Sequence, residues 1–167
     1  MAQEWIEDLA EDIRQRNREA ATEYGRKQHY AGVVSVLGME YFVALVSRLK
    51  ENIDALRIRL QGDPASSETS LERVQANEVK ITRARFPWVD ARLRHDEDTL
   101  TLDYARRPGA EADPAANGAA DRKTRVFAFR VASDDTLSVE DAFAVPPGRY
   151  PKPEDLARYI TEVLFGA

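Results

Sequence analysis

Arginines on the expected strands are the side chains of this sequence best suited to hold a ligand. Guanidinium groups bind phosphates and carboxylates through paired hydrogen bonds, and a sheet that also presents aromatic rings binds single-stranded nucleic acid. The residues that could form such a site are Arg83, Arg92, Arg94 and Arg130. The same pattern is typical of a solvated strand face, on which Asp90 and Asp103 supply ordinary ion pairs. We favour the solvated face over the anion site.

Other chemistry finds little support in the residue types. The chain has no cysteine and only two histidines, His29 and His95. Thiolate nucleophiles and thiolate metal centres are therefore excluded, and a His-rich metal site has few candidate ligands. No stretch matches a phosphate-binding glycine loop or a zinc-protease helix, so we assign no catalytic residue, no metal and no cofactor. A carboxylate acid/base site stays open, because 29 Asp and Glu residues single out no pair.

The elements that would position these residues begin with an N-terminal helical region over residues 1–60. From Trp5 to Tyr24 apolar side chains recur at helical spacing on an otherwise charged surface. The expected interaction face of this first helix consists of Trp5, Leu9, Ile13 and Tyr24. Such a narrow stripe indicates contact with a single neighbour, either the next helix or a second chain.

A second helix follows, with apolar residues at steps of three and four from Val34 to Leu60. Between the two, Gly25 and Gly32 each cost about 1 kcal/mol relative to alanine in a helix interior, so the sequence predicts a break there. The first 60 residues are accordingly expected to form two helices, arranged as a hairpin or as one long broken helix.

Residues 61–70 have the Gly, Pro and Ser content of a linker, and residues 71–167 change to strand periodicity. Alternating apolar residues predict an antiparallel sheet of about five strands between Glu78 and Val139. Within it, 107–121 reads as a flexible insertion because it has almost no large apolar residue. A C-terminal helix starting near Pro153 is expected to pack on the sheet, which gives an α+β fold and one compact unit.

Charge and hydropathy limit the setting. The net charge of −5 argues against a nucleic-acid partner, because phosphate binding requires concentrated positive charge. The most apolar run, 31–46, is shorter than the roughly 20 residues that cross a bilayer, and the acidic N-terminus has no signal-peptide pattern. We therefore expect a soluble cytoplasmic protein without a membrane partner.

Three functional hypotheses remain, and no motif names an activity. The first is a non-enzymatic interaction or structural module that forms a homo-oligomer or binds a partner protein through the N-terminal helix. The second is anion or single-stranded nucleic-acid binding through the strand arginines. The third is a hydrolase-like enzyme with a carboxylate site. The first is favoured because the narrow stripe needs a cover.

Overall fold

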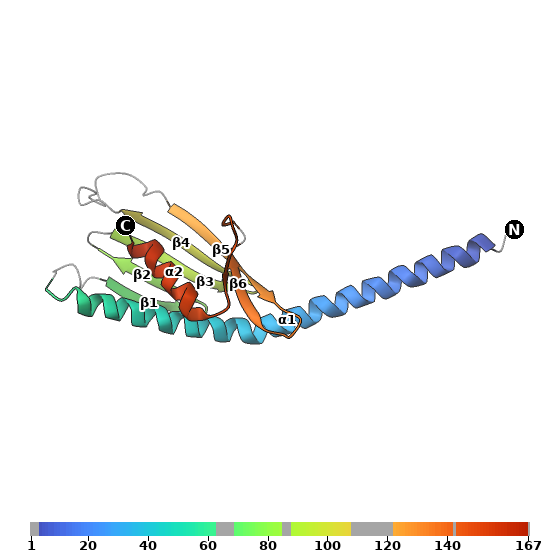
Figure 1. Cartoon of the computed structure of the whole chain (residues 1–167), viewed down its shortest axis with the longest axis horizontal. Coiled ribbons are helices and arrows are strands. Elements are labelled where there is room, and N and C mark those ends of the chain that lie inside the picture. The colour runs from blue at the N-terminus through green and yellow to red at the C-terminus, as the bar shows by residue number, and fades with distance from the viewer. Residues whose placement is uncertain (1–3, 63–68, 85–87, 108–121, 142, 167) are drawn as a thin grey trace.

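The computed structural model shows an α+β protein with a long N-terminal helix, an antiparallel sheet and a C-terminal helix (Figure 1). It describes residues 4–62, 69–84, 88–107, 122–141 and 143–166. The helices are α1 (Glu4–Arg59) and α2 (Pro153–Phe165). The strands are β1 (Thr69–Gln75), β2 (Glu78–Arg83), β3 (Trp88–Asp96), β4 (Thr99–Arg107), β5 (Arg122–Val131), β6 (Leu137–Asp141) and β7 (Gly148–Tyr150). The coarse fold prediction is thus confirmed.

The sheet is a meander, in which each strand pairs antiparallel with the next one in the chain and the spatial order is β1 to β7. Its register follows the alternation of the sequence. Leu93 pairs with Leu102, and both side chains are fully buried, whereas the neighbouring Arg92 pairs with Asp103 on the opposite face. A side-chain period of two separates the faces in this way, so each strand gives one face to the core and one to solvent.

The described strands number seven, and the expected count of about five is wrong in the two edge strands. β1 includes residues 69 and 70, which the sequence placed in the linker, and its Val74 is 50% exposed. β7 is only three residues long. Each edge strand pairs with a single neighbour and contributes few residues to the core. Its sequence therefore lacks a clear alternation of apolar and polar residues.

The expected break between two N-terminal helices is also wrong, because α1 runs without interruption through Gly25 and Gly32. A Cβ on either glycine would meet no atom within 4 Å, so no close packing explains them. Glycine lowers helix stability but does not end a helix when no proline or capping turn follows it. Two contacts of α1 with the body secure the helix just after Gly25. His29 Nε2 lies 2.7 Å from Asp135 Oδ1, and the Tyr30 hydroxyl donates to the Phe129 carbonyl at 2.8 Å.

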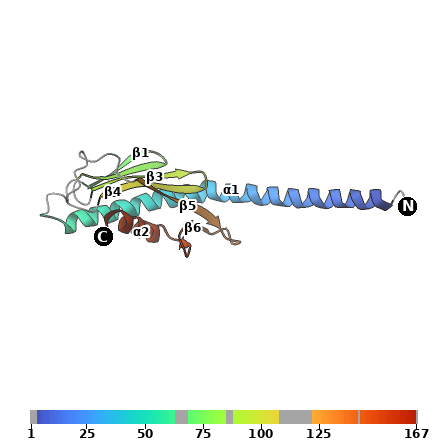
Figure 2. The ribbon, with the colours of Figure 1, turned by 90° about the horizontal axis from the view of Figure 1, so that it is seen from above.

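The core lies between one face of the sheet and a layer made by α1 and α2, which pack side by side (Figure 2). The buried row of α1 includes Val34, Phe42, Leu45 and Leu49. α2 begins at Pro153, as the sequence predicts, and buries Leu156, Ala157, Ile160 and Leu164. Proline suits this first position because its missing N–H has no partner in the first turn of a helix.

One hydroxyl joins these two layers at the end of the sheet. Tyr41 is 6% exposed, and its hydroxyl lies 2.9 Å from the Tyr150 carbonyl and 3.3 Å from the Lys152 carbonyl. Burial raises the pKa of the Tyr41 phenol, so the group is a donor throughout the physiological range. Most of the linker 61–70 and of the insertion 107–121 lies outside the described residues.

Candidate functional site

The N-terminal half of α1 is the most unusual feature of the molecule. Residues 5–29 form a straight helical extension that leaves the body and points away from it (Figures 1 and 2). We call this segment the arm. Large apolar side chains remain 47–64% exposed along it, although such groups are normally buried. They are Trp5, Ile6, Leu9, Ile13 and Tyr24.

The arm is held at its root only. Among the described residues, the hydrogen bonds and ion pairs of residues 5–28 join one arm residue to another, such as Arg14 to Glu11 and Lys27 to Glu23. Hydrogen bonds to the body begin at His29 and Tyr30, and an open hollow between Thr22 and Asp135 adjoins the root of the arm. The direction of the arm is therefore fixed by the body, while none of the described residues covers its apolar stripe.

The stripe of the arm continues the buried row of the body. Tyr24, Ala31, Gly38 and Leu45 follow one another at intervals of seven residues, which is just under two helical turns. Gly38 and Leu45 are buried against the sheet, whereas Tyr24 is 64% exposed. One side of α1 is therefore mainly apolar from Trp5 to Ile53, with polar interruptions at Arg16, Asn17 and Lys27, and the described part of the body covers its C-terminal half.

The opposite side of α1 is apolar for a shorter distance. Val36 and Val43 are 60% and 48% exposed over the body. By length and composition alone, α1 contains an 18-residue window apolar enough to cross a membrane. Tyr41, Phe42 and Leu45 belong to the core, so placing this part of α1 in lipid would remove it from the sheet. The absence of a membrane partner stays a prediction.

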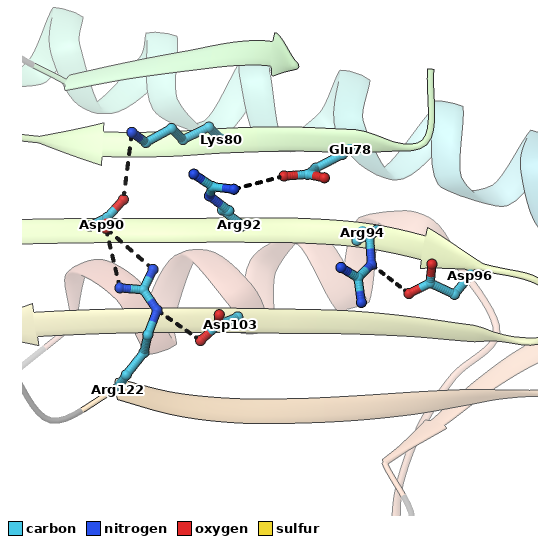
Figure 3. Close-up of polar contacts among 8 residues, drawn as sticks. All are labelled: Glu78, Lys80, Asp90, Arg92, Arg94, Asp96, Asp103 and Arg122. Carbon is cyan, nitrogen blue, oxygen red and sulfur yellow. Dashed lines mark hydrogen bonds and ion pairs between the residues drawn. The ribbon is translucent and has the colours of Figure 1, made fainter. Parts of the chain in front are cut away.

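The solvent face of the sheet carries a network of ion pairs (Figure 3). Asp90 lies between two cations, with its carboxylate 4.0 Å from Lys80 Nζ and 3.2 Å from Arg122 Nη2. Arg122 also reaches Asp103 at 3.1 Å, which links β3, β4 and β5. Each exposed pair contributes little, because water and salt screen it.

The arginines of the expected anion site do not converge. Arg83 is 5% exposed and belongs to the inner face of β2, in alternation with Val79 and Ile81. The other three arginines lie on the outer face and are paired with carboxylates. These pairs are Arg92 with Glu78 at 3.5 Å, Arg94 with Asp96 at 2.6 Å and Arg130 with Glu140 at 3.8 Å. An incoming anion would have to displace these carboxylates.

A polar cluster that the sequence analysis missed lies on the inner face near α2. Asp141 is 2% exposed and accepts a hydrogen bond from the Phe143 backbone N–H at 3.1 Å. Arg125 Nη1 donates to Asp141 at 3.4 Å, and its guanidinium lies 5.7 Å from the Tyr159 ring centroid. An open hollow of about 540 Å³ adjoins this pair. Arg125 is two residues before the buried Phe127, and Asp141 is two residues after the buried Val139. This alternation in the sequence could have placed both side chains on the inner face of the sheet.

His95 is the other buried group with chemical potential. It is 8% exposed, stacks on Phe42 with ring centroids 5.8 Å apart, and its Nε2 has no hydrogen-bond partner. Burial lowers the pKa of His95, so the ring is neutral near pH 7. In the part of the chain that the structure describes, no three His, Asp or Glu side chains are grouped to hold a metal ion.

Comparison of the chain with protein-family models, with curated proteins and with solved structures finds no match. The geometry of the chain is therefore the basis on which its function is inferred. Among the surfaces described above, the arm has the features of a protein-binding surface. Exposed apolar side chains at helical spacing are the usual contact residues where one helix binds another.

Proposed function

We propose that this protein is a non-enzymatic interaction module whose arm binds another amphipathic helix. The single observation that carries this proposal is the exposure of the apolar stripe. Trp5 and Leu9, for example, keep 59% and 47% of their surface in water. A continuous helix that projects from a folded body and presents such a stripe resembles one half of a helix–helix contact.

The size of the stripe sets the strength of the contact. Five side chains that each expose about 100 Å² give about 500 Å² per arm and about 1,000 Å² for a pair of arms. This total lies at the lower end of specific interfaces, so the association is expected to be reversible and dependent on concentration. When the partner dissociates, the arm remains hydrated because charged residues make up most of its surface outside the stripe.

The test is the mass of the full chain in solution, measured by light scattering over a hundredfold range of concentration. We expect the average mass to rise above that of one chain as concentration increases. A variant that lacks residues 1–24 is expected to stay monomeric because it has lost the stripe. It should still fold, because the buried core residues of α1 begin at Val34. Circular dichroism of the variant checks that the body is folded. A full chain that stays monomeric throughout would count against self-association, and unchanged behaviour of a larger species on truncation would exclude the arm.

The alternatives have less support. Anion binding would require Arg92 and Arg94 to exchange their carboxylate partners for the ligand. A hydrolase would require convergent carboxylates in a cleft, whereas Asp141 in the hollow is engaged by Arg125 and by backbone. The polar groups of both alternatives already have partners in the structure, whereas the apolar stripe is exposed to solvent.

A further inference from the structure

Strand β5 is longer than its neighbour β6, and the extra length leaves one edge of β5 open. β4 pairs with β5 from Arg122 to Ala128, whereas β6 pairs with it only from Ala128 to Val131. Figure 1 shows β5 running past the end of β6. Among the described residues, no strand therefore lies against the β6 side of residues 122–127. The hollow of about 540 Å³ lies beside this part of β5.

The register of the sheet identifies the backbone groups that face the hollow. In an antiparallel pair, alternate residues direct their N–H and C=O groups to opposite sides of the strand. The Phe129 N–H donates to the Asp98 carbonyl at 3.0 Å, at the start of β4, so the odd-numbered residues of β5 face β4. Thr124 and Val126 accordingly direct their N–H and C=O groups toward the hollow. Neither has a backbone hydrogen bond to a described residue on that side.

The lining of the hollow agrees with a space beside a strand edge. It includes Lys123 and Arg125, which alternate in phase with the inner face of β5, and also Thr124 and Val126, which belong to the outer face. A hollow over one face of the sheet would touch only every second residue. Asp141, the last residue of β6, lies at the end of the hollow where the two strands separate.

We propose that an extended acidic peptide of a partner protein binds in this hollow as an added strand beside β5. Its backbone would exchange hydrogen bonds with Thr124 and Val126, the mode in which a peptide extends an open sheet edge. The open edge over residues 122–126 is about 17 Å long at about 3.4 Å per residue, so it accommodates four or five peptide residues. This inference goes beyond the proposed function, because it concerns the body of the protein and not the arm.

The charges beside the edge select an acidic peptide. Arg125 is paired with Asp141 at 3.4 Å, whereas Lys123 is exposed and has no ion pair with a described residue. An acidic peptide residue opposite Lys123 would supply that pair, and a β-branched residue would pack beside Val126 on the other face. Pairing with β5 of a second copy is disfavoured. In registers centred on Thr124 or on Arg125, the Arg125 side chain would lie opposite Lys123 or Arg125 of the other copy, and such like charges repel.

Selection of random peptides of about eight residues, displayed on phage against the full-length protein, tests the proposal. Such peptides span the edge but are too short to form the stable helix that the arm would bind. The most enriched peptide is then synthesised, and its Kd for three folded variants is measured by fluorescence polarisation. Thr124→Pro removes the outward N–H, at an edge position where proline is tolerated, and Thr124→Val is the matched control that keeps it. Lys123→Glu reverses the charge that faces the peptide.

The added strand predicts enriched peptides with an acidic residue, whose Kd rises at least tenfold in Thr124→Pro and at least fivefold in Lys123→Glu but stays unchanged in Thr124→Val. In the unmodified chain, the peptide should also protect the Thr124 and Val126 amides from hydrogen exchange, which decides the question if the proline variant does not fold.

The contrary results are equally distinct. Failure to enrich any peptide, equal Kd values for Thr124→Pro and Thr124→Val, or unchanged exchange of the two amides would overturn the added strand. Enriched peptides without an acidic residue would overturn the acidic partner. A dimer that Thr124→Pro dissociates would replace the peptide by a second copy. None of these results bears on the arm, so this inference and the proposed function can fail separately.

Discussion

Replacing Leu9 and Ile13 together by alanine should dissociate the pair of arms without unfolding the protein. The two side chains are 47% and 48% exposed, so about half of each remains to be buried by a partner. Full burial of a Leu or Ile side chain is worth about 1.5–3 kcal/mol, and a partner buries about half of each side chain here. After subtracting the methyl group that alanine keeps, each replacement removes roughly 0.7 kcal/mol of binding free energy. Two residues in each of two chains then give about 3 kcal/mol, or roughly a hundredfold in Kd.

The fold of the monomer should be unaffected, because these side chains do not belong to the core and alanine has the highest helix propensity. Sedimentation equilibrium measures the Kd, and urea unfolding measures the stability of the body. Val36→Ala is the matched control, since Val36 is 60% exposed on α1 but lies off the stripe. A Kd of the double variant within threefold of the original would refute the assignment of the stripe as the contact surface.

Three further predictions concern the body that carries the arm. Gly38→Ala should destabilise the fold by about 1 kcal/mol, because its Cβ would lie 3.3 Å from His95 Nε2. Gly32→Ala meets no atom within 4 Å and should stabilise the fold by about 1 kcal/mol. Equal unfolding free energies of the two variants in chemical denaturation would contradict this packing. Tyr41→Phe should cost about 1 kcal/mol through the lost hydroxyl bond to Tyr150, while Tyr24→Phe in the arm should leave the unfolding midpoint unchanged. Because burial lowers the pKa of His95, against the opposing effect of Asp96, the unfolded chain takes up a proton below about pH 6.5 before the folded one does. Stability should therefore fall from pH 7.5 to pH 5.5, and a His95→Leu variant with the same pH slope would exclude His95 as the cause.

The sequence allowed much of the body to be predicted, because buried positions repeat with the period of their element. Val34, Leu45 and Leu49 have helical spacing, and Val89, Ala91 and Leu93 alternate, so a long helix and a central hairpin were predictable. Gly25 and Gly32 misled the prediction, since the energetic cost of a glycine does not decide whether a helix ends. β1 and β7 were missed because edge strands need little apolar sequence.

The candidate site divides in the same way. Apolar spacing identified the stripe from Trp5 to Tyr24, but it could not show that the helix continues straight into the body and that no described residue covers the stripe. Ion-pair partners depend on strand register, which no local pattern encodes. For that reason Arg122 as the partner of Asp90, and Asp141 as the partner of Arg125, emerged only with the structure.

Hydrogen–deuterium exchange, measured at low and at high protein concentration, shows whether the apolar stripe of the arm becomes covered by a partner. Pairing of the arm with a second helix predicts that amides in residues 5–24 exchange rapidly when the chain is dilute and become at least tenfold more protected at high concentration, while amides of β3 and β4 keep the same protection. Equal exchange of the arm at both concentrations, with mass spectrometry covering Trp5 to Tyr24, would contradict it.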